Sequence, residues 1–279
     1  MAEQAKYLYE ADRTDARAAG DYGVALLQLG MRTPPRGPDQ RRDYELSEEL
    51  LNRTLAHDPQ SRGNARFKTQ VESLLAGVCL AHGEHAAGIR YYAMAIATAE
   101  KYLGPHPSNS STLKGFVVAV SGMAEEQARS GNREEALATL DRALRLAKTL
   151  DASVAPTALL PRVNVARSWQ AAGSVYTILS AREHCDRAVQ DRHAAVIWYQ
   201  RSLDQWHKLE SQNGFANFQH EMDAAALALT GGGVNRPLSG ADRSKIGRGM
   251  AAAGQWPGRK NSPYLKYFRR FFALQNEQI

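Results

Sequence analysis

One stretch of the chain carries cysteine and histidine at a spacing similar to that of metal ligands: Cys79, His82 and His85. Cysteine and histidine a few residues apart are the usual ligands of structural zinc. A helix would put Cys79 and His82 on one face, but Gly83 predicts a turn before His85, and no fourth ligand is apparent. We therefore expect no metal site, with Cys79 packed in the core and both histidines at the surface.

The sequence patterns of nucleophilic, acid–base and phosphate-transfer catalysis are missing. The Gly-rich stretch at 230–233 and the later Ser-Lys-Ile-Gly at 244–247 lack the Gly-Lys-Ser/Thr ending of a phosphate-binding loop. A protein kinase needs a Gly-rich loop, a His-Arg-Asp catalytic loop and an Asp-Phe-Gly triplet, and none occurs here. The triplet at 184–186 is no substitute, because the catalytic-loop Asn does not follow it. We expect neither catalysis nor a cofactor.

The elements that must position any functional residue are predicted to be helices. Ala, Leu, Arg, Glu and Gln dominate residues 1–230 and apolar residues recur at helical spacing, whereas β-branched runs and hairpin signals are missing. Pro and Gly gather at 33–38, 104–107, 155–161 and after 230, which favours loops there. A helical chain divided in this way calls for a search for internal repeats.

A helix–turn–helix pattern with small residues at the expected helix crossings recurs four times. The clearest copy comprises Met123, Ala124, Gln127, Gly131, Ala136, Leu140 and Ala143. Two more comprise Leu75, Ala76, Cys79, Gly83, Gly88, Tyr92 and Ala95, and Trp169, Ala172, Gly173, Tyr176, Ala195, Tyr199 and Ser202. A weaker copy comprises Tyr22, Ala25, Leu26, Leu29, Ser47, Leu51, Thr54 and Pro59. Small residues let two helices approach to about 8–10 Å.

This pattern resembles the tetratricopeptide repeat (TPR), in which Trp-x2-Leu-Gly-x2-Tyr is followed by Gly, Ala, Phe, Ala and Pro. The closest matches are Trp169 to Tyr176, Gly131 to Ala143 and Leu55 to Pro59, and the resemblance covers residues 10–210. The last small residue falls at 54, 95, 143 and 202, spacings of 41, 48 and 59 that exceed the usual repeat length of about 34 residues. Longer helices and loops must absorb the excess.

The resemblance implies an all-α fold: a right-handed TPR-like α-solenoid of about four irregular helix pairs, with one further helix at 217–229. Residues 103–107 are similar to the linker between the longer repeats of the kinesin-light-chain type. Residues 194–206 and 21–30 resemble the end and the beginning of the TPR region that some bacterial serine/threonine protein kinases carry C-terminally. This second likeness implies a bacterial, kinase-associated regulatory or sensory region, with the kinase on a separate or upstream polypeptide.

In a TPR array the first helix of each pair lines a concave groove that binds an extended peptide or a partner helix. Carried over position by position, the resemblance places these residues there: Gln70, Ser73, Val118, Ser121, Glu125, Arg129, Arg167, Gln170, Ser174 and Thr177. The clamp of two Lys, two Asn and one Arg found in some TPRs is not expected, because Asn and Lys are missing from these positions. Trp198, Tyr199 and Trp206 are predicted to pack between neighbouring pairs.

The net charge of +6 is distributed unevenly. Residues 232–279 hold nine Lys or Arg against Asp242 and Glu277, a balance of +7, so the rest of the chain is at −1. No apolar run approaches the roughly 20 residues of a membrane span, and the polar N-terminus does not resemble a signal peptide. The two cysteines fit a reducing compartment, and we expect a cytoplasmic protein.

Two regions are therefore predicted: a helical repeat domain at 1–230, and a basic Gly-rich linker with an amphipathic C-terminal helix at 231–279. Within the second, an aromatic stripe recurs at helical spacing: Tyr264, Tyr267, Phe268, Phe271 and Phe272. Three alternatives stay open for it: docking on an exposed apolar end of the solenoid, contact with an anionic membrane or nucleic acid, and no role.

Taken together, these features indicate a non-enzymatic scaffold that binds a protein or peptide partner in its groove. The alternatives are the regulatory region of a serine/threonine kinase system, and a nucleic-acid or membrane-surface binder acting through residues 232–279. Binding through the basic tail would fall steeply with salt, whereas binding in the groove would survive deletion of the tail.

Overall fold

A computed structural model describes residues 2–31, 38–103, 110–155, 157–183, 186–212 and 214–229, and the regular elements in these ranges are all helical. The all-α prediction is confirmed for this part of the chain. The elements are α1 (Ala2–Ala11), α2 (Ala16–Gly30), α3 (Pro38–His57), α4 (Arg62–Ala81), α5 (His85–Leu103), α6 (Ser110–Arg129), α7 (Arg133–Ala152), α8 (Leu159–Arg182), α9 (Asp186–Leu209), the 3-10 helix η1 (Phe215–Phe218) and α10 (Gln219–Leu227). The predicted linker and C-terminal helix at 231–279 lie outside the described residues, as do His184 and Cys185.

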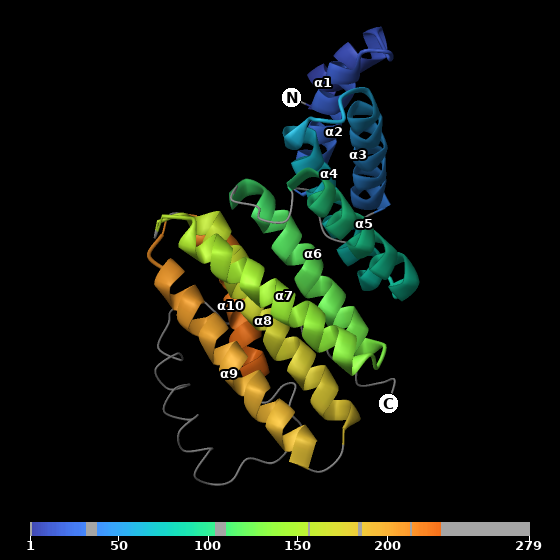
Figure 1. Cartoon of the computed structure of the whole chain (residues 1–279). Helices are drawn as coiled ribbons and strands as arrows, with labels where there is room; N and C mark the ends of the chain where they lie inside the picture. The colour runs from blue at the N-terminus through green and yellow to red at the C-terminus, as the bar shows by residue number, and fades with distance from the viewer. Residues whose placement is uncertain are drawn as a thin grey trace.

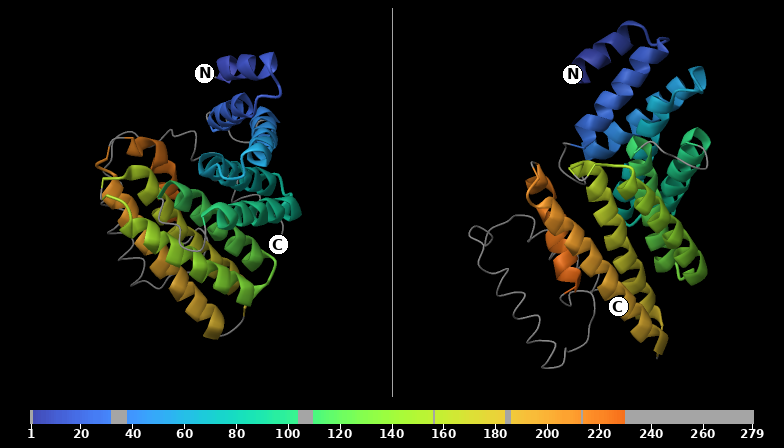
Figure 2. Two further views of the ribbon diagram at one scale, coloured as in Figure 1. Left: turned by 45° about the horizontal axis from the view of Figure 1, so that its top comes forward. Right: turned by 60° about the vertical axis from the view of Figure 1, so that its left-hand side comes forward.

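The helices from α2 to α9 pack as four consecutive pairs: α2 with α3, α4 with α5, α6 with α7, and α8 with α9. Each second helix also packs against the first helix of the next pair, and α6 lies against α8. Figures 1 and 2 show the pairs following one another from α1 at one end of the molecule to α9 and α10 at the other. This arrangement confirms the four helix pairs and is that of an α-solenoid.

The repeat is more regular than the sequence frame indicated. The first helices begin at residues 16, 62, 110 and 159, so their starting positions differ by 46, 48 and 49, instead of by the expected 41, 48 and 59. The sequence spacings were counted between single small residues of the second helices. These residues do not occupy equivalent places, because Thr54 and Ser202 lie in the last third of their helices, whereas Ala95 and Ala143 lie near the middle of theirs. The excess over a short repeat goes into helices of 15–24 residues.

Two of the turns within pairs contain a glycine, as predicted, and in the structure both glycines are left-handed. Gly83 and Gly131 have φ of 77° and 85°, a region that side chains other than Gly rarely adopt. In both turns the amide that follows the glycine donates to a carbonyl in the preceding helix: Glu84 to Cys79 and Asn132 to Gln127, each at 2.9 Å. Such bonds satisfy carbonyls that the helix end would leave unpaired.

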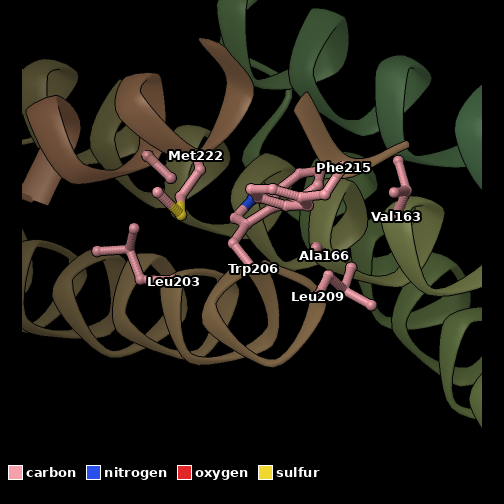
Figure 3. Packing of buried hydrophobic residues seen from close by; sticks show 8 residues of the cluster. Val163, Ala166, Leu203, Trp206, Leu209, Phe215 and Met222 are labelled. Atoms are coloured by element: carbon pink, nitrogen blue, oxygen red, sulfur yellow. The ribbon is translucent and has the colours of Figure 1, made fainter. Parts of the chain in front are cut away.

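The ends of the array are covered by short helices. At the N-terminus α1, which the sequence did not predict, packs through Ala5 and Tyr9 on α2 and α3. At the C-terminus η1 and α10 pack on α9, close to the further helix expected at 217–229. Figure 3 shows Trp206 of α9 beside Phe215 and Met222, with ring centroids of Trp206 and Phe215 6.2 Å apart. None of the described helices is both long and apolar enough to cross a membrane.

Candidate partner-binding face

The predicted groove residues of α4 contribute one side chain to the surface. Gln70 is half-buried, and its amide donates to the Sδ of Met31 at 3.4 Å. Ser73 is buried, and its hydroxyl donates to the Thr69 carbonyl one turn earlier at 2.8 Å. Assigning Ser73 to an open groove is therefore wrong, because its hydroxyl is satisfied inside its own helix.

On α6 the predicted residues divide in the same way. Ser121 is buried between α6 and α8, where its hydroxyl lies 3.5 Å from that of Ser168, so its assignment to an open groove is also wrong. Glu125 and Arg129 stay partly accessible, with 23% and 34% of their side chains exposed, and Arg129 donates to Glu125 at 3.0 Å. Val118 is half-buried on the same helix.

The Glu125 carboxylate connects α6 to α8. Burial raises the pKa of Glu125, while the charge of Arg129 and the hydroxyl of Ser174 on α8 lower it. Ser174 and Thr177 also interact with the hydroxyl of Tyr199 on α9. Burial of this side chain raises the pKa of Tyr199 to about 12. Tyr199 is neutral at physiological pH. Together, Glu125, Ser174 and Tyr199 form a polar cluster that joins α6, α8 and α9.

Two glycines, one on α8 and one on α6, allow tyrosine rings from the second helices to pack directly on the helix backbone. A methyl group built on Gly173 would lie 2.7 Å from Cδ1 of Tyr199, so the ring rests directly on the backbone of α8. Gly122 on α6 is covered in the same way by the ring of Tyr92 from α5. Burial raises the pKa of Tyr92, with Glu125 and the neighbouring Glu126 adding to the effect. The absence of a side chain on these glycines therefore brings the rings of Tyr92 and Tyr199 close to Glu125.

Sequence reasoning missed Glu126 and its contact with His85. Glu126 is fully buried, pairs with Arg129 on its own helix, and lies 2.9 Å from Nδ1 of His85 at the start of α5. Arg129 is three residues after Glu126 and four after Glu125, the spacings at which helix side chains meet. That spacing was a usable signal for the pair on α6, whereas the link to His85 required the fold.

The C-terminal part of the predicted groove is covered by α10. Arg167 donates to both carboxylate oxygens of Glu221, at 2.6 and 2.5 Å, and to Asn164 at 3.1 Å. Its guanidinium carbon also lies 5.7 Å from the centre of the Phe218 ring. Arg167 therefore connects α8 to α10, and because 41% of its side chain is exposed, its role in the groove stays a prediction.

The four residues that remain together form what we call the α6–α8 face: Glu125, Arg129, Gln170 and Ser174. Each is half-buried, and they come from the two first helices that pack side by side. Gln70 lies on α4, which packs against α6. Opposite charges and neutral polar groups adjoin on this face, so it can accept and donate hydrogen bonds.

The other residues singled out by the sequence lie elsewhere. Cys79 is buried, and Nδ1 of His82 lies 2.8 Å from the Val78 carbonyl of its own helix. Among the described residues, no three His, Cys, Asp or Glu side chains converge as metal ligands would. Trp198 packs against the α7–α8 cluster around Leu140, and Trp206 is fully buried, so the core packing predicted for these aromatic residues is confirmed.

A cavity of about 710 Å³ lies at the N-terminal end, away from the α6–α8 face. It is formed by the start of α2, the end of α3 and the start of α4, and none of the predicted groove residues lines it. Its lining includes the acidic residues Asp15, Asp21 and Asp58 together with Arg17 and His57. Comparison with known proteins supplies no further guide, since no family model and no curated protein matches the chain.

Proposed function

We propose that the chain is a non-enzymatic scaffold that binds an extended peptide or a partner helix on the α6–α8 face. The observation that carries this proposal is the joining of two adjacent first helices into one partly exposed polar surface through Glu125 and Ser174. Because packed helices hold these side chains in place, the scaffold loses little freedom on binding, and the partner carries most of the entropic cost.

We further propose that the array is of the right-handed TPR type. The left-handed glycines Gly83 and Gly131, which occupy the same turn in successive repeats, support this proposal, as does the packing of Tyr199 on Gly173, two positions of the TPR pattern. The association with a serine/threonine kinase stays a prediction from sequence likeness. The partner chemistry that the face fits is polar with both signs of charge, since Glu125 and Arg129 lie side by side.

A photo-crosslinking amino acid at Gln170 tests the binding face. The matched control carries the same amino acid at Gln190, a glutamine on the exposed side of α9. We expect position 170, and not position 190, to crosslink one discrete protein in cells of the source organism, and we expect that complex to persist in high salt. Crosslinks of equal yield from both positions would contradict the proposal.

Substitution of Gln170 by Glu provides a second, quantitative arm. It adds a negative charge to the same face as Glu125, so it should weaken binding of the identified partner while the free energy of unfolding stays the same. A partner that binds the variant unchanged but is lost when residues 232–279 are deleted would locate the binding site in the tail and overturn the assignment.

A further inference from the structure

One side of α9 is only half covered by the helix that follows it. Leu203, Trp206 and Leu209 lie on this side and pack with Met222 and Ala225 of α10 (Figure 3). Other sides of α9 are used differently, since Trp198 packs toward α7 and Ser202 donates to the Ala166 carbonyl of α8 at 2.9 Å. Trp206 and Leu209 lie close to Ser202 around the helix and share the contact with α8, so Leu203 marks the edge of this side that is clear of α8.

This side continues toward the start of α9 as an exposed strip that carries two valines, with the polar residues Arg192 and Gln200 beside them at helical spacing. Val196 and Val189 precede Leu203 by one and two heptads, a spacing that keeps them on nearly the same side of the helix. They are 42% and 53% exposed, whereas Leu203 is buried. The reason is length: α10 has 9 residues against 24 in α9, and Figure 2 shows it beside the C-terminal half of α9 only.

The position where α10 ends indicates what covers the strip. The chain leaves α10 at Leu227–Leu229, on the side of α9 whose coverage stops there, and continues to Ile279. The stretch of helix from Val189 to Leu203 is about 21 Å long at the rise of an α-helix. The segment 230–262, at about 3.3 Å per residue when extended, reaches every point of it.

The segment at 263–274 has the composition that such a strip requires. Its stripe of two tyrosines and three phenylalanines is predicted to lie on one side of a helix, with Lys266, Arg269 and Arg270 elsewhere. A repeat array needs a cap whose outer surface is polar. A helix that is aromatic on one side and basic on the other meets both requirements.

We propose that residues 263–274 dock through this aromatic stripe on Val189 and Val196, completing the cap that α10 begins. The interface is a continuation of the contact between α9 and α10, and the occupant is the same chain. The proposal does not depend on partner binding at the α6–α8 face, because Val189 and Val196 lie on α9.

The direct test places a photo-crosslinking amino acid at Val196 in the full-length chain. We expect crosslinks within the same molecule to residues 263–274, identified by mass spectrometry of the monomer band. The same amino acid at Arg201, on another side of α9, should give none. A crosslink found only in a covalent dimer would assign the strip to a second copy, and the absence of any crosslink to 263–274 would equally overturn the proposal.

Matched aspartate variants give an independent readout. Val196 and Ile197 are adjacent and almost equally exposed, at 42% and 40%, but a helix turns them about 100° apart. Chymotrypsin cleavage at Tyr264, Tyr267 and Phe272, which all the variants keep, should accelerate in Val196→Asp and in Phe268→Asp/Phe271→Asp. It should not accelerate in Ile197→Asp or in Arg269→Gln/Arg270→Gln. Equal cleavage rates in Val196→Asp and Ile197→Asp would contradict docking on this strip, as would protection of the tail only when anionic vesicles or nucleic acid are added.

Discussion

Helix α8 packs against α6 on one side and against α10 on another, and the two contacts use different kinds of residue. Toward α6 the contact includes polar pairs, with Ser121 against Ser168 and Glu125 near Ser174, beside apolar clusters such as that of Leu113 and Val165. Toward α10 it combines the double hydrogen bond between Arg167 and Glu221 with the apolar cluster around Trp206. Charged side chains stay partly exposed at both surfaces, but of Arg129 and Arg167 only Arg167 is bound by a carboxylate from a later helix.

This difference shows how charged residues are held along an array of similar helices. A charged residue on a first helix can be paired within its own helix or by the next helix, and the two arrangements orient it differently. Arg129 pairs with carboxylates of its own helix and stays partly exposed, whereas Arg167 is held by a carboxylate from the covering helix. Glu125 and Arg129 in the middle of the array are therefore paired within one helix, whereas Arg167 near the C-terminal end is bound by a second helix while 41% of its side chain stays exposed.

The largest effect is expected from Trp206→Ala, which removes the centre of the α9–α10 contact. Trp206 is fully buried among Val163, Phe215 and Met222, so its loss should lower the free energy of unfolding by about 3–5 kcal/mol. Urea unfolding followed by circular dichroism measures the change. If the loss is below about 1 kcal/mol, α10 contributes little to the stability of the array and is not a real cap.

The next effect is expected from Gly173→Ala, which disturbs the support beneath the α6–α8 face. The added methyl would press on the Tyr199 ring at 2.7–2.8 Å, and overpacking of this kind costs about 1–3 kcal/mol. Gly77→Ala is the control, because a methyl there meets nothing within 4 Å and should stabilise helix α4 by up to about 1 kcal/mol. Changes of the same sign in both variants would contradict the close packing of Tyr199 on α8.

A smaller effect is expected from breaking the link between Arg167 and Glu221. The double-mutant cycle with Arg167→Gln and Glu221→Gln should give a coupling energy below about 1 kcal/mol, since the Arg167 side chain is 41% exposed. The exposed pair Arg145 and Asp141 on α7 is the reference and should couple more weakly. Partner binding should be unaffected by either Gln variant, and a loss of binding in Arg167→Gln would return this residue to the binding face.

Packing rules explain which parts of this architecture could be predicted from sequence. Small residues at helix crossings and glycine at a left-handed turn are local requirements, so Gly83, Gly131 and the four pairs were predictable. The period was predicted less well, because Thr54 and Ser202 lie nearer the ends of their helices than the matching residues of the middle two pairs. Repeat position alone does not give the length of helix on either side of a crossing.

The candidate site shows where the same reasoning fails. Ser73 and Ser121 share repeat positions with residues that face a groove in regular arrays, yet both are buried here. A short hydroxyl side chain can bond to a carbonyl of its own helix, as Ser73 does with Thr69, so burial leaves no donor unsatisfied. For Arg167 the missing information was the position of α10, which belongs to a later part of the chain. The pairing of Arg167 with Glu221 depends on tertiary structure, and no local sequence pattern predicts it.

The smallest effect is a pH dependence that separates the surface toward α6 from the surface toward α10. Burial raises the pKa of Glu125 above its ordinary 4.5, so the folded state holds this proton more tightly than the unfolded state. The carboxyl therefore favours folding when protonated, and its contribution to stability falls as the pH rises from about 4.5 through the folded pKa. Replacement by glutamine removes this dependence at Glu125.

Relative to Glu125→Gln, the unsubstituted chain should accordingly lose stability as the pH is raised from 4 to 8, as measured by urea unfolding at several pH values. Glu134→Gln, at an exposed residue in the first turn of α7, should show no such trend. A difference that grows in the opposite direction would mean that Arg129 and Ser174 outweigh burial at Glu125. In that event Glu125 would be stabilised mainly by its ion pair, as Glu221 is by Arg167. The two surfaces would then differ only in whether the ion pair lies within one helix or joins two.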